Sequence, residues 1–210
     1  MRRIKSIKER LQDIVEISYE LLCNQIVGGK ICIHNEASLQ MHLGVILKQV
    51  GHLYELSKED HFSIELETWQ DIEGTIKSKK GRARCDIQLN MTNGYETYNV
   101  AIELKYFRHH TNEAVTDNRF SILLDLENLE QYKTNNPNLL CYEIVYTDNE
   151  NYTKIDNRSK IKITPSISGN DEPYVGRIIK LRRTYRSVWD TYNTTDGEHG
   201  HHFLMINLNN

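Results

Sequence analysis

Apolar residues recur at helical spacing in the first part of the chain, which indicates two amphipathic helices. The first helix is predicted to end near Gly28-Gly29. Its apolar face comprises Ile4, Ile7, Leu11, Ile14, Val15, Leu21 and Leu22. Asn35 offers a cap for a second helix that stops near Gly51. The apolar face of this second helix comprises Leu39, Leu43, Ile46, Leu47 and Val50.

The apolar spacing then changes to every second residue, which is the period of a half-buried strand. This alternation covers residues 62–67, 82–89 and 100–107. Asn93-Gly94 lies between the last two segments and is a strong hairpin signal. We therefore expect the last two segments to form antiparallel strands, each with an apolar face turned toward the core.

The sequence pattern predicts fewer regular elements in the second half of the chain. After a polar loop, we expect a helix over about residues 120–133 and a short apolar strand over 139–145. Residues 148–173 are rich in Asn, Asp and Ser, which is typical of an irregular surface excursion. The pattern over 177–189 fits a helix or an extended segment, and that over 203–208 predicts a final edge strand. Together the elements predict an α/β layer structure and no repeated βαβ unit.

The length of 210 residues suits a single domain. We divide it into an N-terminal helix, a core, and a polar excursion with edge elements, over residues 1–29, 30–147 and 148–210. The formal net charge of -3 does not by itself indicate a nucleic-acid-binding protein. Positive charges nevertheless gather in three segments, at residues 1–10, 77–84 and 177–186. These segments are either solvated surfaces or parts of a groove that follows phosphates.

The cysteines indicate a reducing compartment. All four cysteines lie in apolar stretches, and they form no close pair and no CxxC motif. They are Cys23, Cys32, Cys85 and Cys141. The N-terminus has no apolar signal-peptide stretch, and no run approaches the roughly 20 apolar residues of a membrane span. We therefore expect a soluble, cytoplasmic protein with no membrane partner and no small-molecule cofactor.

Asp86, Glu103 and Lys105 are predicted to share one face of the hairpin. If the loop spans residues 93–96, Asp86 lies directly opposite Glu103, with Cβ atoms roughly 4.5–5.5 Å apart. With a tight two-residue turn, Asp86 faces Ala101 instead, and Glu103 is its diagonal neighbour. A register shifted by one residue would bury charges and expose the apolar residues. Both remaining registers therefore bring the two acids and the amine together.

Two carboxylates this close repel, and each raises the pKa of the other unless a cation lies between them. Hard oxygen ligands with room for water and phosphate oxygens suit Mg²⁺, for which Mn²⁺ is a substitute. Such an ion polarises a phosphoryl group and lowers the pKa of a bound water. Lys105 is placed to orient that water or to stabilise charge on phosphorus. The alternative is an ordinary ion pair between Glu103 and Lys105 on the exposed face of a strand.

Cys85-Asp86, then sixteen residues, then Glu103-Leu104-Lys105 resembles the signature of the PD-(D/E)XK nuclease superfamily. The resemblance covers roughly residues 30–147, with Cys85 where the signature has proline. It implies a restriction-endonuclease-like core, in which helices flank a central mixed β-sheet in the order αβββαβ. It also implies catalysis by Asp86, Glu103 and Lys105. Glu36, on the helix before the sheet, would complete both the catalytic set and the metal site of Asp86 and Glu103.

The function implied by this resemblance is Mg²⁺-dependent endonucleolytic hydrolysis of DNA, in restriction or another defence role. A homodimer that pairs through the N-terminal helix is expected with it. Two alternatives stay open: a catalytically inactive member of the fold that serves in binding or assembly, and a ribonuclease. Candidate nucleic-acid contacts flank the core strands or lie on the following helix: Lys79, Lys80, Arg82, Arg84, Gln88 and Gln131.

Some residues have a second interpretation. Glu36 is either a metal ligand or a first-turn acid that the helix dipole favours. Trp69 either stacks on a base or packs against its neighbours. The histidines at positions 199, 201 and 202 suggest a metal site, but without a partner acid a flexible polar tail is preferred.

Overall fold

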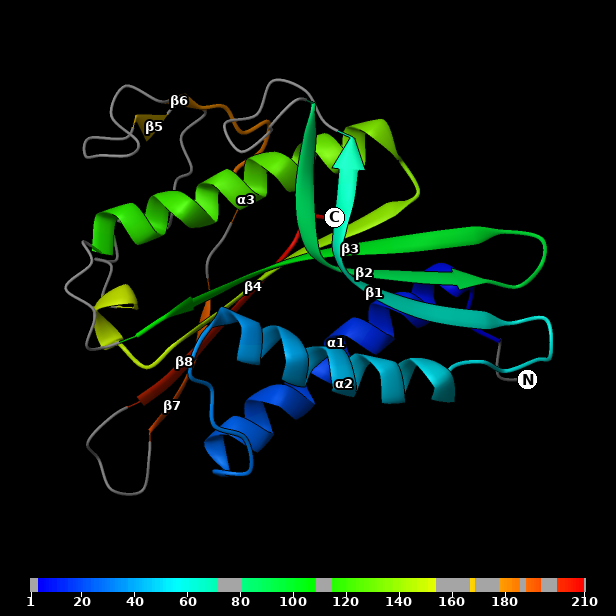
Figure 1. The fold of residues 1–210 in the computed structure, drawn as a ribbon, viewed down its shortest axis with the longest axis horizontal. Coiled ribbons are helices and arrows are strands. Elements are labelled where there is room, and N and C mark those ends of the chain that lie inside the picture. The colour runs from blue at the N-terminus through cyan, green and yellow to red at the C-terminus, as the bar shows by residue number, and fades with distance from the viewer. Residues whose placement is uncertain are drawn as a thin grey trace.

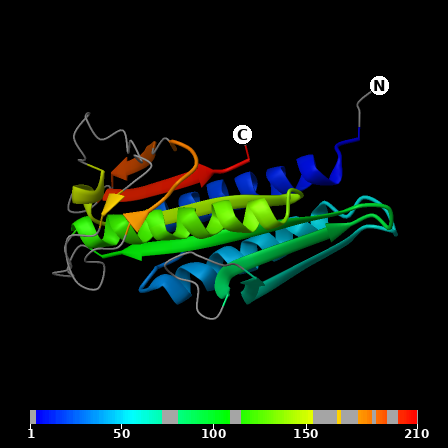
Figure 2. The same ribbon diagram turned by 90° about the horizontal axis from the view of Figure 1, so that it is seen from above.

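The computed structural model describes residues 4–71, 81–108, 115–153, 167–168, 178–185, 188–193 and 200–209. They form a layered α/β structure, in which α1 and α2 cover one face of a six-stranded sheet and α3 covers the other (Figure 1 and Figure 2). The helices are α1 (Ile7–Val27), α2 (Glu36–Leu53) and α3 (Val115–Asn135). The strands of this sheet are β1 (His61–Asp71), β2 (Arg82–Thr92), β3 (Thr97–Phe107), β4 (Leu139–Thr147), β7 (Trp189–Asn193) and β8 (Gly200–Asn207).

The two N-terminal helices confirm the prediction, except that Ile4 precedes α1 and Leu21 is exposed. Both helices begin with a reciprocal cap. Ser6 Oγ accepts a hydrogen bond from the Glu9 N–H, while the Glu9 carboxylate accepts one from the Ser6 N–H. Asn35 and Ser38 exchange the same pair of bonds at the start of α2. These bonds satisfy N–H groups that the first turn of a helix leaves open. The helix α2 ends at Leu53, slightly beyond its predicted end.

The sheet is mixed, as expected for an α/β fold. Its strand order is β1-β2-β3-β4-β8-β7, in which β3 and β4 are parallel and the other neighbours are antiparallel. Parallel neighbours cannot be joined by a tight turn, and α3 supplies the crossover between β3 and β4. Each face of the central strands is therefore covered by helices, and all nine residues of β4 are buried.

The predictions for the C-terminal part were wrong in two respects. Strand β8 lies between β4 and β7, so residues 203–208 are not at an edge, and β7 is the edge strand. The short β7 is mostly exposed and lacks the apolar alternation from which the other strands were predicted. His201 and His202 belong to β8 rather than to a flexible tail, whereas His199 lies outside the described residues. The His201 Nδ1 atom is 2.9 Å from the Tyr146 hydroxyl.

Within the described part of the segment that the pattern left undecided, residues 180–185 form neither helix nor strand and include a bend. Ile178–Ile179 forms a short strand, β6, which pairs with β5 (Ile167–Ser168). The expected polar excursion, 148–173, lies largely outside the described residues and begins with the 3-10 helix η1 (Glu150–Tyr152).

The hairpin between β2 and β3 has the longer of the two loops considered. Thr92 pairs with Thr97, which leaves residues 93–96 as the loop. The Asn93 side chain accepts hydrogen bonds from the N–H groups of Tyr95 and Glu96. Gly94 has a φ of 85°, a conformation that costs glycine little. The register that would align Asp86 with Glu103 is therefore the one that forms.

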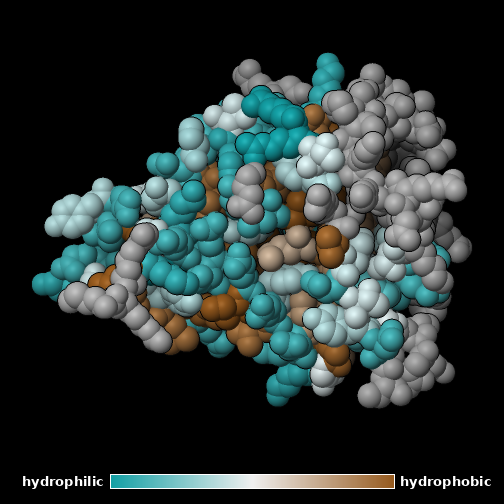
Figure 3. All heavy atoms as spheres, turned by 180° about the vertical axis from the view of Figure 1, so that it is seen from behind, coloured by the Kyte–Doolittle hydropathy of each residue, from teal (hydrophilic) through white to brown (hydrophobic). Residues whose placement is uncertain are grey.

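Separate apolar cores fill the space on each side of the sheet. One lies between the sheet and the pair α1 and α2, and the other between the sheet and α3. On the side opposite to the view of Figure 1, hydrophilic residues predominate and hydrophobic ones form small separate patches (Figure 3). Within the described ranges, no helix is both long and apolar enough to cross a membrane.

Strand β2 leaves β3 part-way along its length. The pairing of the two strands stops at Ile87 and Ile102. Ile87 packs in the core beside α1 and α2, whereas Cys85 packs in the core beside α3. Residues two apart on a regular strand share a face, so the backbone of β2 must twist at Asp86. Figure 1 shows the adjoining ends of β1 and β2 bending away from the rest of the sheet.

Candidate active site

Asp86 lies at the point where β2 and β3 separate. Continuing the register would set it opposite Glu103, but the ladder stops one pair earlier. Its Oδ2 atom instead accepts a 2.7 Å hydrogen bond from the backbone N–H of Leu104. The Asp86 carboxylate therefore replaces the backbone carbonyl that would accept this bond in a regular sheet. Because Leu104 lies between Glu103 and Lys105 in the chain, the bond brings Asp86 close to both.

Gln40 of α2 closes the other side of this interruption. Its side-chain Nε2 donates to the Asp86 carbonyl at 2.7 Å and to Glu67 Oε1 at 3.1 Å. Glu67 is the β1 residue that would face Asp86, and its φ of 56° lies in the left-handed region. The amide of Gln40 thus satisfies a carbonyl that the broken ladder leaves open. Gln40 was not predicted as a site residue, although it follows Glu36 by four residues, a spacing that puts both on one helix face.

Glu103 points to the α3 side of the sheet and is almost fully buried, with 2% of its surface exposed. Its Oε1 atom accepts a 3.2 Å hydrogen bond from the Tyr132 hydroxyl of α3. Burial raises the pKa of Tyr132, and the negative charge of Glu103 raises it further. The phenol therefore stays protonated and holds the carboxylate in one orientation. Tyr132, which neighbours the predicted contact Gln131, is thus the residue of α3 that reaches Glu103.

Lys105 of β3 contacts side chains of both α2 and α3. Its Nζ atom lies 2.8 Å from Asp125 Oδ2 of α3 and 3.4 Å from Glu36 Oε2 of α2. It also donates to the Leu104 carbonyl at 2.7 Å. Because Glu36 and Asp125 belong to helices on opposite faces of the sheet, the ammonium lies in the gap between the separating strands. The ion pair with Glu36 joins the first turn of α2 to this gap.

The electrostatics of Lys105 reflect an excess of negative charge around it. Burial lowers the pKa of Lys105, but the nearby carboxylates outweigh burial and raise it above its usual range. The carboxylates that act in this way are Glu36, Glu143, Asp86 and Glu103. Lys105 therefore stays protonated at neutral pH, where it can orient a nucleophile or offset negative charge but cannot act as a general base.

Two acids of the site, Asp125 and Glu143, were not predicted. Both are fully buried. Glu143 is aligned with Glu103 on the neighbouring parallel strand β4. A signal for Glu143 existed, because an acid within the apolar run 139–145 needs a partner or a function. Asp125 gave no such signal, since an acid in a helix is usually exposed.

The donor chemistry of this cluster suits a divalent cation, although the side chains are not gathered as ligands. In the described residues, no three His, Cys, Asp or Glu side chains form a group that could hold a metal ion. The Lys105 ammonium instead lies among the carboxylates, where its positive charge offsets theirs. Carboxylate and carbonyl oxygens are the ligands that Mg²⁺ prefers. Asp86 and Glu103 are the residues that would hold such an ion, with Glu36 at the more exposed side.

Cys85, which stands at the position of the motif proline, is fully buried. Burial raises the pKa of its thiol well above the usual range, and the charges of Glu103 and Asp86 add to this. The thiol is therefore neutral and packs as a small apolar side chain beside the acids.

The predicted nucleic-acid contacts are only partly brought to the site. Arg82 and Arg84 are exposed on the end of β2 that bends away from β3. Gln88 lies on the paired part of β2, where its amide joins the side chains of Gln70 and Asn90. Gln131 is half-buried on α3. Lys79 and Lys80 lie outside the described residues.

Trp69 packs against a neighbouring residue and still leaves its ring exposed. Its ring is exposed, and the Arg84 guanidinium lies 5.1 Å from the ring centroid. Arg84 also forms an ion pair of 3.1 Å with Glu67. The bent end of the hairpin thus presents an aromatic and a cationic group a short distance along the chain from Asp86.

Comparison of the chain with protein-family models, with curated proteins and with solved structures gives no match in any of the three.

Proposed function

We propose that this chain is a Mg²⁺-dependent endodeoxyribonuclease with a restriction-endonuclease-like core, which hydrolyses phosphodiester bonds in duplex DNA. The observation that supports this most strongly is the position of Lys105. Its ammonium lies in the gap between β2 and β3, where the charges of Asp86 and Glu103 act on it. Two acids that can hold a divalent ion, with an amine beside them, are groups that can hydrolyse a phosphodiester.

Each of the three side chains is held by a partner of its own. The Leu104 N–H orients Asp86, and the Tyr132 hydroxyl orients Glu103. Asp125 holds the ammonium of Lys105 from the α3 side. Fixed orientation matters in a nuclease because misplacement of a catalytic group by about 1 Å can cost about a hundredfold in rate.

The excess of carboxylates supports a requirement for a cation. A polynucleotide phosphate would be repelled by Asp86, Glu103 and Glu143 together. A bound Mg²⁺ would supply Lewis acidity and a bound water with a lowered pKa. The part of Lys105 is then to orient the attacking water and to offset charge that develops on the phosphoryl oxygens.

Incubation with defined substrates tests this proposal. The purified protein is given supercoiled plasmid, linear duplex, single-stranded DNA and RNA, each with Mg²⁺, with Mn²⁺ and with EDTA. We expect duplex DNA to be cut only with a divalent ion. Preferential cutting of RNA would instead support the ribonuclease alternative.

Variants connect the activity to the site. Asp86→Asn and Lys105→Ala should abolish cleavage in proteins whose circular dichroism shows them to be folded. Glu96→Gln, in the exposed β2–β3 loop, is the matched control and should cut like the unchanged protein. Cleavage that survives both site substitutions would refute the assignment.

One observation favours a second candidate, a non-catalytic binding or assembly protein with the same fold. Lys105 already forms a 2.8 Å ion pair with Asp125, so the site has a charge partner without a metal. Calorimetric titration with Mg²⁺ and Mn²⁺ separates the two candidates. The nuclease should bind an ion and lose that binding in Asp86→Asn and Glu103→Gln, whereas the second candidate predicts no binding that depends on these residues.

A further inference from the structure

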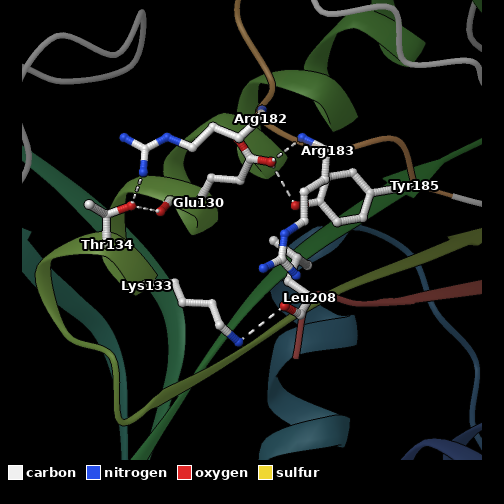
Figure 4. A pocket seen from close by; sticks show the side chains of 7 residues that line it. All are labelled: Glu130, Lys133, Thr134, Arg182, Arg183, Tyr185 and Leu208. Carbon is white, nitrogen blue, oxygen red and sulfur yellow. Dashed lines mark hydrogen bonds between the residues drawn. The ribbon is translucent and has the colours of Figure 1, made fainter. Parts of the chain in front are cut away.

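A second group of charged side chains lies at the C-terminal end of α3 and shares no residue with the candidate active site. It lines a cavity of about 220 Å³ between α3, the segment 182–185 and Leu208 (Figure 4). The lining residues are Glu130, Lys133, Thr134, Arg182, Arg183, Tyr185 and Leu208.

Glu130 builds this cavity by fixing the segment that forms one wall. Its carboxylate accepts hydrogen bonds from the backbone N–H of Arg182 at 2.7 Å and of Arg183 at 3.2 Å. The Tyr185 hydroxyl donates a third bond of 2.7 Å to it. Glu130 is 8% exposed, and Figure 4 shows its carboxylate turned toward the segment rather than into solvent. Among the lining residues that the structure describes, the one acid is therefore used to hold two arginines in place.

The cations around the cavity are also anchored. Lys133 Nζ donates to the Leu208 carbonyl at 3.0 Å and to Asn209 Oδ1 at 2.8 Å. Arg182 donates from one guanidinium nitrogen to Thr134 Oγ1 at 2.6 Å. These bonds involve two of the three donors of the ammonium and one of the five donors of the Arg182 guanidinium. The anchored groups thus keep donors for a further acceptor, with little side-chain entropy left to lose on binding.

The cavity carries a surplus of positive charge. Among the described lining residues three cations face one acid, which leaves two positive charges. Burial lowers the pKa of Lys133, and the charge of Arg183 and of Lys8 on α1 lowers it further, against an opposing effect of Cys141. An anion bound here would relieve this repulsion.

We propose that this cavity binds a phosphate monoester. Arginine presents paired donors that match phosphate oxygens, and Lys133 adds a point charge. A phosphate monoester carries about −1.5 to −2 charge at pH 7, which balances the surplus better than the single charge of a carboxylate or an internal phosphodiester. The monoester belongs either to a free nucleotide or to the 5′ end of a polynucleotide.

Binding is measured by calorimetry in low salt with EDTA, so that the result does not depend on the proposed nuclease activity. The probes are dAMP, deoxyadenosine, and one oligonucleotide with either a 5′-phosphate or a 5′-hydroxyl. We expect dAMP to bind and deoxyadenosine not to bind. A 5′-phosphate that strengthens oligonucleotide binding assigns the site to polynucleotide ends, and binding of dAMP with no such effect assigns it to free nucleotides.

Variants test whether the cavity is responsible. Lys133→Gln and Arg183→Gln should each weaken dAMP binding at least about tenfold, since each removes a charge-assisted hydrogen bond. Arg183→Lys should recover part of the loss. Lys180→Gln removes a neighbouring exposed cation that does not line the cavity, and it should leave binding unchanged.

The proposal is overturned if dAMP and deoxyadenosine behave alike, or if Lys133→Gln and Arg183→Gln bind dAMP as the unchanged protein does. Thermal unfolding of each variant shows that it is folded at the temperature of the titration. If the protein cuts DNA but does not bind dAMP, the proposed function stands and the cavity proposal fails. If it binds dAMP but does not cut DNA, the cavity proposal stands and the proposed function fails.

Discussion

The carboxylate of Asp86 accepts a hydrogen bond of 2.7 Å from the backbone N–H of Leu104, across the gap where β2 leaves β3. In a continuous ladder a backbone carbonyl of β2 would accept this bond, and here the Asp86 side chain accepts it instead. The same bond fixes the acid beside Glu103 and Lys105. Structure and proposed chemistry therefore depend on different properties of Asp86: the fold needs an acceptor, and the chemistry needs a negative charge.

Substitution of Asp86 separates these two properties. Asp86→Asn keeps an oxygen that can accept from the Leu104 N–H, so we expect the free energy of unfolding to change by less than about 1 kcal/mol. Asp86→Ala leaves that N–H, on a fully buried residue, without its acceptor and should cost about 1–3 kcal/mol. Urea denaturation measures both. Equal stability of the two variants would show that the bond does not support the fold.

The ion pair between Lys105 and Asp125 should couple strongly, because Asp125 is fully buried and the Lys105 side chain is 12% exposed. Lys105→Ala and Asp125→Asn should each destabilise the protein by about 3 kcal/mol, since each leaves a buried charge without this partner. The double variant should lose less than the sum of the two. A double-mutant cycle in EDTA measures the coupling energy.

Lys58 and Glu59 provide the control for that cycle. Their side chains are 3.7 Å apart and far more exposed, so their coupling energy should fall between about 0 and 1 kcal/mol. If the coupling energy of Lys105 and Asp125 is no larger than that of Lys58 and Glu59, solvent or another group replaces the lost partner.

The part of the site that could be predicted from the sequence is the part set by local chemistry. The alternation of apolar residues on both strands limited the hairpin to two registers, and the structure has the one with the loop 93–96. That register brings Asp86 near Glu103. The cap at Asn35 likewise fixes Glu36 in the first turn of α2.

The remainder of the site depends on contacts between residues far apart in the chain. Alternation predicts a regular strand and gives no sign of the twist at Asp86, which forms because Gln40 and the Leu104 N–H replace the lost strand pairing. The place of Asp125 depends on how α3 packs over β3, and no local pattern sets that. The edge position of β7 was missed for the same reason: its pairing with β8, and not its polar sequence, makes it a strand.

Acid should weaken the fold through Asp60. A hydrogen bond from the Arg10 guanidinium lowers the pKa of Asp60 to about 2, against the opposing effect of burial, and bonds from the N–H groups of Leu56 and Ser57 assist. Because the pKa is lower in the folded state than its usual value of 3.8, this stabilisation is complete above pH 4 to 5. It disappears as the pH falls from about 4 toward 2. Its size is about 2 kcal/mol.

Asp60→Asn isolates this contribution from those of the other acids. At pH 7 the variant should be less stable than the unchanged protein by at least about 2 kcal/mol, because Arg10 is left buried without its charge partner. The difference should shrink steadily below pH 4 in urea denaturation at several pH values. A difference that stays constant between pH 6 and pH 2 would contradict a lowered pKa of Asp60.

Two glycines of α2 should respond in opposite directions to the same substitution. At Gly44 an added Cβ would lie 3.7 Å from the nearest atom, in the Leu66 side chain, which is an ordinary contact. Gly44→Ala should therefore stabilise the helix by about 0.5–1 kcal/mol. At Gly51 an added Cβ would lie 2.2 Å from the Phe62 ring, so the ring or the helix must move.

Gly51→Ala should accordingly destabilise the protein by about 1–3 kcal/mol, since overpacking outweighs the gain in helix propensity. Thermal unfolding of the two variants side by side makes the comparison, because both carry the same chemical change on the same helix. Phe62→Leu added to Gly51→Ala should recover part of the loss by making room for the methyl group. Stabilisation by both alanines would show that α2 does not pack against β1 as closely as Gly51 and Phe62 indicate.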